Sequence, residues 1–373
     1  MEAQRVLVVG GGMAGLAAAI GLRRAGLAVD LVEIDRQWSS AGVGIVQEGN
    51  VLRAMAALGL AREYVAAGFP YDRVRLLDAA GAPVDEIDGA ALSGPDYPAM
   101  HGIDRDALHE LLRVGAQRGG VRIRLGASVA TLESRGAAVR VCCTDGIEET
   151  YGLVVGADGL HSRLRALAFG GQAGPRYTGQ AVWRYALPRA VEVDCLTKWL
   201  GPRGEAGMCP VSDRSMYLFV TTPEPQGYRP TPYDAAEQMR ARLEPYGAGV
   251  AALSPLVENP EAVAFRPVQS LLLPAPWYRG RIVLIGDAAH AGALQLGHGA
   301  GMAIEDAVVL AQEYADPQRR DDALQRFMQR RYPRVQALWA AAGRVTEAAL
   351  AGRDPAERAA LLQQMHALTA AGS

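Results

Sequence analysis

A glycine-rich stretch near the start of the chain carries the strongest chemical signal. Gly10, Gly12 and Gly15 form the pattern G-x-G-x-x-G between an apolar run and a helical run. The first glycine permits a tight turn, the second lets a pyrophosphate approach the backbone, and the third allows close packing of helix on strand. The free N–H groups and the dipole at the helix start attract phosphate. The pattern therefore predicts dinucleotide binding through Gly10, Gly12, Met13, Ala14 and Gly15.

An acidic residue supports this prediction. Glu33 lies 18 residues beyond Gly15, at the end of the next apolar run. A carboxylate at this place accepts hydrogen bonds from the ribose hydroxyls of an adenosine, whereas an ordinary glycine-rich turn would leave Glu33 unexplained. The elements that must position these residues are a strand over residues 5–9, a helix over 13–25 and a strand over 28–32, which together form a βαβ unit.

Later segments decide between FAD and NAD, which the glycine pattern alone does not. Residues 102–105 end in Arg105, residues 154–165 contain Asp158-Gly159, and residues 286–290 begin with Gly286-Asp287, followed by the glycine-rich stretch 297–306. These segments resemble, in sequence and in order, the motifs of the flavoprotein aromatic hydroxylases, the family of para-hydroxybenzoate hydroxylase and salicylate hydroxylase. The resemblance extends from the first strand to about Leu310.

The resemblance implies a role in FAD binding for each segment. Asp287, at a strand end, is expected to accept hydrogen bonds from the ribityl hydroxyls, although a turn cap is its alternative role. The turn after it lets backbone approach the isoalloxazine, and the following helix start stabilises reduced flavin. Asp158, supported by Arg165, is expected between the pyrophosphate and the NAD(P)H route, although Asp-Gly is also a common turn. The implied FAD contacts are Arg105, Asp158, Arg165, Asp287, Gly297, Gly299, Ala300 and Gly301.

The flavin loop departs from the family pattern. Members commonly carry a proline near the flavin, but residues 291–296 contain none. His298 and Gly301 occupy two positions that are usually Gln and Asn. His298 is a candidate catalytic residue that would hydrogen-bond the flavin or a flavin-bound peroxide, with a bystander role as the alternative.

The family mechanism implied by the resemblance uses NADH or NADPH as a transient electron donor, without a second dinucleotide domain. Reduced FAD then forms a C4a-hydroperoxide with O2, which hydroxylates an electron-rich ring carbon of a small aromatic or heteroaromatic substrate. The protein must exclude water and align that carbon. The rival interpretations are a flavin-dependent dehydrogenase or reductase on the same fold and a non-catalytic flavin-binding regulatory protein. A halogenase is disfavoured because no Trp-x-Trp-x-Ile-Pro stretch is present.

Candidate substrate contacts come from the tyrosine-rich middle of the chain. Arg184 or Arg214 would orient a substrate carboxylate through a bidentate contact, and Tyr217 or Tyr185 would relay a proton. Each of these four side chains has a structural role as its alternative. The predicted catalytic residues are therefore His298, Arg184, Arg214 and Tyr217.

The elements around these motifs predict two lobes and a tail. Helices are expected over residues 50–67 and 104–119, and alternating strands from 176 to about 270 indicate a β-sheet lobe. Asp354, Pro355 and Glu357 predict the N-cap, first position and capping-box partner of a last helix. The predicted fold is α/β, with a Rossmann-like FAD-binding domain (1–70, 101–175 and 276–316), an inserted substrate-binding β-sheet domain (71–100 and 176–275) and C-terminal helices (317–373).

Bulk composition excludes several other classes. The chain has 373 residues, 21% of them charged, with a net charge of −2. It has no basic excess that would attract nucleic acid. Its four cysteines lack metal-ligand spacing, so we expect no metal site and a reducing cytoplasm. Residues 6–22 lack a signal-peptide cleavage site, and no transmembrane segment is expected. A monomer or a homodimer fits equally well.

Overall fold

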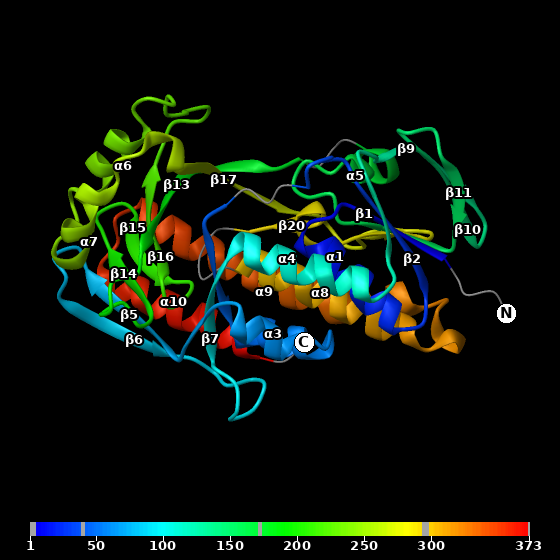
Figure 1. The fold of residues 1–373 in the computed structure, drawn as a ribbon, viewed down its shortest axis with the longest axis horizontal. Helices are drawn as coiled ribbons and strands as arrows, with labels where there is room; N and C mark the ends of the chain where they lie inside the picture. The colour runs from blue at the N-terminus through cyan, green and yellow to red at the C-terminus, as the bar shows by residue number, and fades with distance from the viewer. Residues whose placement is uncertain (1–4, 39–41, 171–173, 293–297, 372–373) are drawn as a thin grey trace.

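The computed structural model describes residues 5–38, 42–170, 174–292 and 298–371, apart from the side chains of Ala248 and His298. In Figure 1 the β9–β11 sheet and the strands β13–β16 lie toward opposite ends of the long axis. The helices α8 (His298–Ala315) and α9 (Ala323–Leu350) run along that axis. The molecule therefore has two lobes joined by long helices.

The first lobe is built on the six-stranded sheet β18-β19-β12-β1-β2-β8. β1 pairs in parallel with β2 and β12, and β12 pairs in parallel with β19. Val8 and Val155, on neighbouring strands, are fully buried, as expected for a parallel sheet covered on both faces. The strands are β1 (Arg5–Val9), β2 (Ala28–Glu33), β8 (Arg122–Leu125), β12 (Leu153–Gly156), β18 (Tyr278–Arg279) and β19 (Ile282–Leu284).

The carboxyl ends of β19, β12, β1 and β2 lie side by side, because these four neighbours run in the same direction. The segments that follow them begin at Ile285, Ala157, Gly10 and Ile34 respectively. Ligands of such open sheets bind at this edge, where the strand order reverses. The parallel pairing thus collects motifs that lie up to 276 residues apart, Gly10 and Gly286, at one place.

The second lobe is built on the eight-stranded sheet β20-β17-β13-β16-β15-β14-β5-β6. α6 (Ala235–Leu243) and α7 (Ala248–Leu253) bury Met239 and Val250 in a core with Trp183. Side chains alternate between the two faces of a strand, so the neighbours of Trp183 point away from that core. The strands are β5 (Arg73–Asp78), β6 (Pro83–Asp88), β13 (Arg176–Pro188), β14 (Leu196–Leu200), β15 (Glu205–Pro210), β16 (Ser215–Pro223), β17 (Ala264–Leu272) and β20 (His290–Ala291).

Smaller elements complete the lobes. The sheet β3-β7-β4 contains β3 (Gly44–Glu48), β4 (Phe69–Tyr71) and β7 (Met100–Asp104), and the sheet β11-β10-β9 contains β9 (Val129–Arg135), β10 (Ala138–Cys143) and β11 (Glu148–Tyr151). The helices of the first lobe are α1 (Met13–Arg24), α2 (Gly49–Ala57), α3 (Ala61–Ala66), α4 (Arg105–Arg118) and α5 (Arg163–Phe169). Short 3-10 turns span Ser254–Leu256, Pro260–Ala262, Gly286–Ala288 and Pro317–Arg319.

The single helix predicted over residues 50–67 is wrong, because the structure has two helices there, α2 and α3. Gly59 adopts a φ of 75°, a left-handed conformation that glycine tolerates and that ends a helix. The amide of Leu60 then donates to the carbonyl of Met55 at 2.9 Å. The apolar residues keep the same helical spacing on both sides of Gly59, so the pattern did not reveal that the helix ends there.

The tail forms α9 and a last helix, α10 (Pro355–Ala370). The Asp354 side chain accepts a hydrogen bond from the amide of Ala356 at 2.9 Å, so the predicted N-cap is present. Glu357 binds Arg353 at 2.9 Å, where a capping box had been predicted. The reason is that Arg353, one turn earlier, offers a charged partner.

A histidine anchors α10 to the first lobe and makes stability pH-dependent. His366 Nδ1 lies 3.0 Å from Glu48 Oε2, and both side chains are buried. Burial lowers the pKa of His366, but the Glu48 carboxylate outweighs it and the net pKa is raised. A raised pKa stabilises the fold fully below the ordinary value of 6.5, and this contribution is lost as the pH rises through the folded-state value.

We therefore expect His366→Gln to destabilise the protein by about 1–2 kcal/mol at pH 6, and by less at pH 9. Thermal unfolding of both proteins across this range measures the effect. The exposed His161 supplies the control, since His161→Gln should follow the wild-type profile. An equal loss at both pH values would contradict the assignment of a charged His366.

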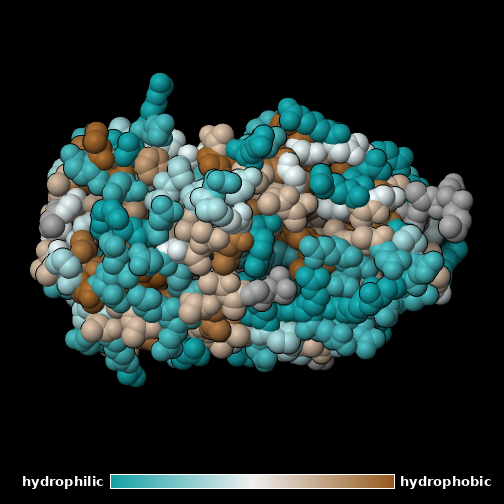
Figure 2. Space-filling view, turned by 90° about the horizontal axis from the view of Figure 1, so that it is seen from below, coloured by the Kyte–Doolittle hydropathy of each residue, from teal (hydrophilic) through white to brown (hydrophobic). Residues whose placement is uncertain are grey.

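The surface offers no single apolar band on the face seen in Figure 2, where hydrophilic residues predominate and hydrophobic ones form small separate patches. Exposed apolar side chains such as Val191, Ile34 and Tyr233 come from different parts of the chain. Among the described helices, none has the length and apolar character needed to cross a bilayer.

Candidate active site

The glycine turn after β1 is shaped for a ligand. Gly10 has a φ of 105°, and a Cβ there would lie 2.4 Å from the carbonyl oxygen of Ala157. Gly15 packs against the same turn, since its Cβ would lie 1.9 Å from the Gly10 oxygen. A Cβ on Gly12, in contrast, would meet no atom within 4 Å. The fold therefore requires Gly10 and Gly15, whereas the space above Gly12 is left open.

The start of α1 faces that open space. Gly12 is the N-cap, no side chain caps the helix, and its first turn contains no acidic residue. Gly12, Met13 and Ala14 line a cavity, so the first N–H groups of the helix and its dipole favour an anion there. A pyrophosphate fits this cradle both sterically and electrostatically.

Glu33 holds the glycine turn, a contact that the sequence did not reveal. Its carboxylate accepts hydrogen bonds from the amides of Gly11 at 2.5 Å and Asp35 at 2.8 Å. The carbonyl of Gly11 lies 2.8 Å from Trp38 Nε1, which donates to it, and 2.9 Å from His109 Nε2. The middle residue of the triplet is thus fixed on both sides. Ribose binding by Glu33 remains a prediction beside this role.

One continuous cavity of about 480 Å³ runs from the glycine turn to the sheet of the second lobe. Its volume lies in the range of about 300–1,000 Å³ that is usual for small-molecule sites. Walls come from both lobes, so a bound cofactor and a substrate on the sheet would share one space. On the first-lobe side it is lined by Gly12, Met13, Ala14, Val43, Arg105, Asp287, Gly299 and Ala300, and on the second-lobe side by Val182, Arg184, Lys198, Glu205, Tyr217, Phe219, Thr221 and Arg266.

Positive charge predominates in this cavity although the whole chain has a net charge of −2. Counted over the described part of the chain, the lining contains four cations, Arg105, Arg184, Lys198 and Arg266, and two carboxylates, Glu205 and Asp287, a difference of +2. Low-dielectric walls focus such a field. The cavity is therefore suited to anionic ligands.

Arg184 is the most enclosed of the three arginines. Its side chain lies among protein atoms, and its half-buried surface opens into the cavity. Burial lowers the pKa of Arg184, Tyr217 raises it, and Arg105 and Arg266 lower it further. Within the described ranges no carboxylate pairs with Arg184, so this permanent cation is available to a ligand carboxylate.

Asp287 and Arg105 line the same cavity, and their charges interact. Burial raises the pKa of Asp287, while His290 and Arg105 lower it. No hydrogen bond to its carboxylate occurs within the described part of the chain, although the side chain lines the cavity. As far as the described residues go, its acceptor oxygens are open to hydroxyl donors, as the predicted ribityl contact requires.

Of the other candidates for substrate contact, one lies inside the cavity and two lie outside it. Tyr217, on β16, is buried and lines the cavity, and burial raises its pKa well above 10, so its hydroxyl is a proton donor. Arg214 lies exposed in the turn before β16 and does not reach the cavity. Tyr185 points into the opposite core, where its hydroxyl accepts from the Asn259 amide at 3.2 Å. The alternation of strand residues separates these side chains.

Asp158 and Arg165 make structural contacts beside the cavity. Asp158 accepts from the Ser162 hydroxyl at 2.5 Å and from the Leu164 amide at 2.9 Å, the turn role named as its alternative. Buried Arg165 donates to the carbonyls of Ala288 at 2.9 Å and Leu160 at 2.8 Å. It therefore ties the Asp-Gly segment to the Gly-Asp turn.

The remaining predicted residues lie at the start of α8. Gly297 and the side chain of His298 fall outside the described residues. Gly299 and Ala300 line the cavity, and a Cβ on Gly299 would meet no atom within 4 Å. Gly301 instead packs against α2, since its Cβ would lie 2.8 Å from a methyl carbon of Val51. Only part of this turn is therefore open to a flavin.

A buried ionic network contacts the Gly-Asp turn through the Gly286 amide. The Asp306 carboxylate on α8 accepts from the Gly286 amide at 2.9 Å, lies 2.5 Å from His290 Nε2, and accepts from Arg331 Nε at 2.7 Å. Arg331, fully buried on α9, also donates to Glu305 at 2.9 Å. The sequence gave no signal for this network, because its members come from three separate segments.

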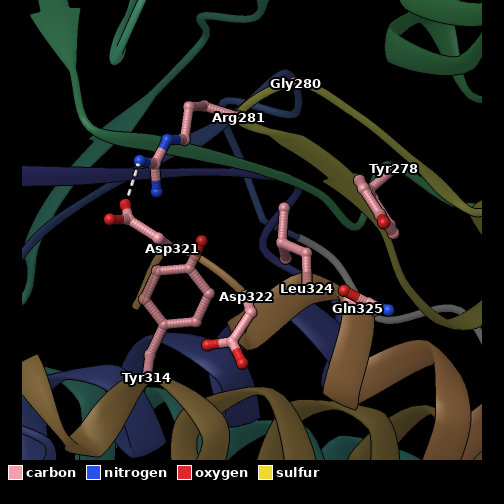
Figure 3. Close-up of a pocket in the computed structure, with 8 residues that line it drawn as sticks. All are labelled: Tyr278, Gly280, Arg281, Tyr314, Asp321, Asp322, Leu324 and Gln325. Atoms are coloured by element: carbon pink, nitrogen blue, oxygen red, sulfur yellow. Dashed lines mark hydrogen bonds and ion pairs between the residues drawn. The ribbon is translucent and has the colours of Figure 1, made fainter. Parts of the chain in front are cut away.

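A smaller cavity of about 130 Å³ lies where the β18–β19 turn meets the start of α9 (Figure 3). Arg281 reaches across it to Asp321 at 2.7 Å, and Tyr314 rises from α8. The Asp321 side chain is almost fully exposed, at 95%, so this contact is a surface ion pair of little energetic weight. None of the predicted site residues lines this cavity.

The parallel sheet with its open glycine turn, joined by a cationic cavity to a second sheet, defines a two-lobed flavoprotein oxidoreductase. The family model described as "FAD binding domain" matches residues 3–342. The chain therefore belongs to this family, and its cofactor is FAD.

Relatives and solved structures agree with this assignment. The putative FAD-dependent monooxygenase YetM of Bacillus subtilis is 29% identical over 359 residues, covering 95% of this chain and 96% of the relative. The 3-amino-4-hydroxybenzoate 2-monooxygenase PtnB3 of Streptomyces platensis is 33% identical over 357 residues, 90% and 85% of the two chains. The structure of Klebsiella pneumoniae HpxO with FAD and uric acid has a TM-score of 0.85 at 25% identity. The match covers 98% of this chain and 93% of that chain. The predicted family, the α/β fold class and the assignment as an FAD-dependent monooxygenase are confirmed.

Proposed function

We propose that this monooxygenase hydroxylates a small aromatic or heteroaromatic substrate, with NADH or NADPH as transient electron donor and O2 as oxygen source. The observation that carries the proposal is the single cavity joining the glycine turn to the second sheet. Relatives named for 3-amino-4-hydroxybenzoate and urate chemistry support an aromatic substrate. The domain division at residues 1–70, 101–175 and 276–316 against 71–100 and 176–275 belongs to the same proposal.

Bound FAD would supply the redox chemistry, accepting a hydride from NAD(P)H and activating O2. The turn Gly10–Gly15 would hold it together with Arg105, Asp287, Gly299 and Ala300, which line the same cavity. Backbone N–H groups of α1 and the cationic cavity would bind its phosphates.

The protein's own task is to place and shield the substrate. Phe219, on the middle strand β16, gives the ring an apolar floor, and its own ring lies 5.9 Å from that of Tyr217. Arg184 orients a carboxylate through its fork of N–H donors. Protonated Tyr217 donates to a substrate oxygen. Walls contributed by both lobes exclude water from the reacting carbon.

Oxygen-atom transfer provides the direct test. The FAD-loaded protein is offered phenolic, pyridine and quinolone acids with NADH or NADPH, and cofactor oxidation and product mass are followed under isotopically labelled O2. We expect at least one acid to stimulate oxidation and to gain one labelled oxygen on its ring. Stimulated oxidation with no labelled product would identify a dehydrogenase or reductase instead. The absence of any stimulation across the panel would overturn the proposal.

Arg184 should govern the binding of that acid. Arg184→Met is expected to raise KM by about 100-fold with a smaller change in kcat, because a contact to a carboxylate is made in ground and transition states alike. Arg214→Met is the matched control, since Arg214 is exposed outside the cavity, and it should change KM by less than about twofold. Steady-state kinetics of both variants decide the assignment. Equal effects of the two substitutions would contradict it.

A further inference from the structure

A buried ion pair forms part of the cavity wall on the second lobe. Lys198 on β14 and Glu205 on β15 both line the cavity, with Nζ and Oε1 2.8 Å apart. Their exposed fractions are only 2% and 4%. Lys198 is also the sole lysine among 373 residues. It belongs to none of the sequence motifs described above.

Stability alone does not account for this pair. β14 and β15 are already joined by an antiparallel ladder from Thr197–Met208 to Leu200–Glu205. Desolvating two charges costs about as much as their attraction returns, so a well-packed apolar pair would hold the strands equally well. A charged pair in the wall of a ligand cavity therefore points to recognition.

A third buried charge makes the group positive. Arg358 reaches in from α10 and donates to the carbonyls of Gly201 at 2.6 Å and Gly204 at 2.8 Å, which are neutral acceptors. Burial lowers the pKa of Arg358, and the nearby Glu205 raises it. Glu205 is thus in contact with Lys198 and close enough to Arg358 to interact with its charge, and the three side chains carry a net charge of +1. An anionic ligand group would balance that charge.

The strand register places this charge opposite Arg184. Arg184 pairs with Phe219, Phe219 with Gly207, and Gly207 with Lys198, so the four residues form one row across four strands. Three interstrand steps of about 4.8 Å separate the two cations by about 14 Å at the backbone. A Cβ on Gly207 would lie 2.5 Å from the Phe219 ring, which shows that the ring covers the middle of the row. The row therefore presents a cation, an aromatic floor and a second cation.

We propose that Lys198, held by Glu205, binds an anionic oxygen of the substrate, a phenolate or a carboxylate, at the end of the ring opposite Arg184. This inference rests on the proposed function and narrows the substrate class to aromatics that carry two oxygen substituents on opposite sides. Glu205 uses one N–H direction of the ammonium group and leaves the other two for the ligand.

The single lysine gives a direct measurement on the unsubstituted protein. Isotopically labelled lysine produces one set of side-chain signals in the oxidised, FAD-loaded enzyme. The probes are 4-hydroxybenzoate and 4-hydroxyquinoline-2-carboxylate, each compared with its carboxamide and with its analogue lacking the hydroxyl group. We expect the Lys198 signals to shift with at least one doubly substituted acid. Persistence of the shift with the carboxamide identifies the phenolate as the bound group, and its persistence without the hydroxyl identifies the carboxylate.

Substitution tests the contact independently. Lys198→Met should weaken binding of that acid by about tenfold or more, and should change the affinity for the analogue lacking the bound oxygen by less than about twofold. FAD affinity should not change. Arg75→Met is the matched control, because Arg75 lies beside Thr197 on the opposite face of the same sheet and pairs with Asp194 outside the cavity. It should leave both affinities intact.

Two results would overturn the inference: no acid of the set moves the Lys198 signals, or Lys198→Met binds the acid as tightly as the wild type does. The titration needs no NAD(P)H and no turnover. A protein that binds the acid through Lys198 without hydroxylating anything would therefore refute the proposed function alone.

Discussion

Gly12→Val should weaken FAD binding severely in a protein that still folds. The backbone of Gly12 is extended, with a φ of −76°, so it tolerates a β-branched residue. The added carbon atoms would project into open space, because no atom lies within 4 Å of a Cβ at this position. That space is the one in which the pyrophosphate must approach the α1 N-terminus. We expect FAD affinity to fall by about 100-fold or more, equivalent to about 3 kcal/mol.

Titration of the apoprotein with FAD, followed by flavin fluorescence, measures this loss, and circular dichroism reports on folding. Gly343→Ala is the control, because Gly343 lies on α9 and its Cβ would also meet nothing within 4 Å. It should bind FAD normally. Gly10→Ala should instead lose both folding and binding, since its Cβ would clash with the Ala157 oxygen at 2.4 Å. Wild-type affinity in Gly12→Val would show that the phosphates do not bind at this turn.

Arg331→Met should cause a large loss of stability. Arg331 is fully buried and pairs with the buried carboxylates of Asp306 and Glu305 at 2.7 and 2.9 Å. Methionine fills a similar volume but removes the positive charge that balances the two carboxylates. Breaking one partner out of a buried pair costs about 3–5 kcal/mol, far more than an exposed pair is worth. Because Asp306 also holds the Gly286 amide, FAD affinity should decrease as well.

Chemical denaturation of the two proteins gives the difference in free energy of unfolding. Arg330→Met is the matched control, since Arg330 is the preceding residue of α9 and makes a partly exposed pair with Glu313 at 2.8 Å. It should cost no more than about 1 kcal/mol. Equal losses in the two variants would show that the buried network stabilises the fold no more than the partly exposed pair does.

The same network predicts acid sensitivity. Burial raises the pKa of Asp306, but His290 and Arg331 outweigh burial and bring that pKa to about 2. A depressed pKa stabilises the fold above the ordinary value of 3.8, and the contribution disappears as the pH falls toward 2. Without Arg331 the pKa of Asp306 rises, so Arg331→Met should lose less stability between pH 4 and pH 2 than the wild type does.

Local pattern accounts for what could be predicted. The turn Gly10–Gly15 and the cap at Asp354 were found because each depends on a few neighbouring residues with distinctive backbone or side-chain chemistry. The break at Gly59 was missed because apolar periodicity ran through it. Among the substrate candidates, Arg184 and Tyr217 line the cavity and Arg214 does not. Alternation along a strand assigns the side chains to two faces, but it does not show which face will line the cavity.

The sequence by itself determined the family and the cofactor and predicted the turn for the phosphates, since each of the motifs involved is a short run of neighbouring residues. Tertiary structure alone decided that β12 lies between β1 and β19, that Glu33 holds the Gly11 amide, and that Lys198 and Glu205 face the cavity with Arg358 behind them. The reason is physical: such contacts depend on strand order and on which face each lobe buries, and both are settled by the packing of distant segments.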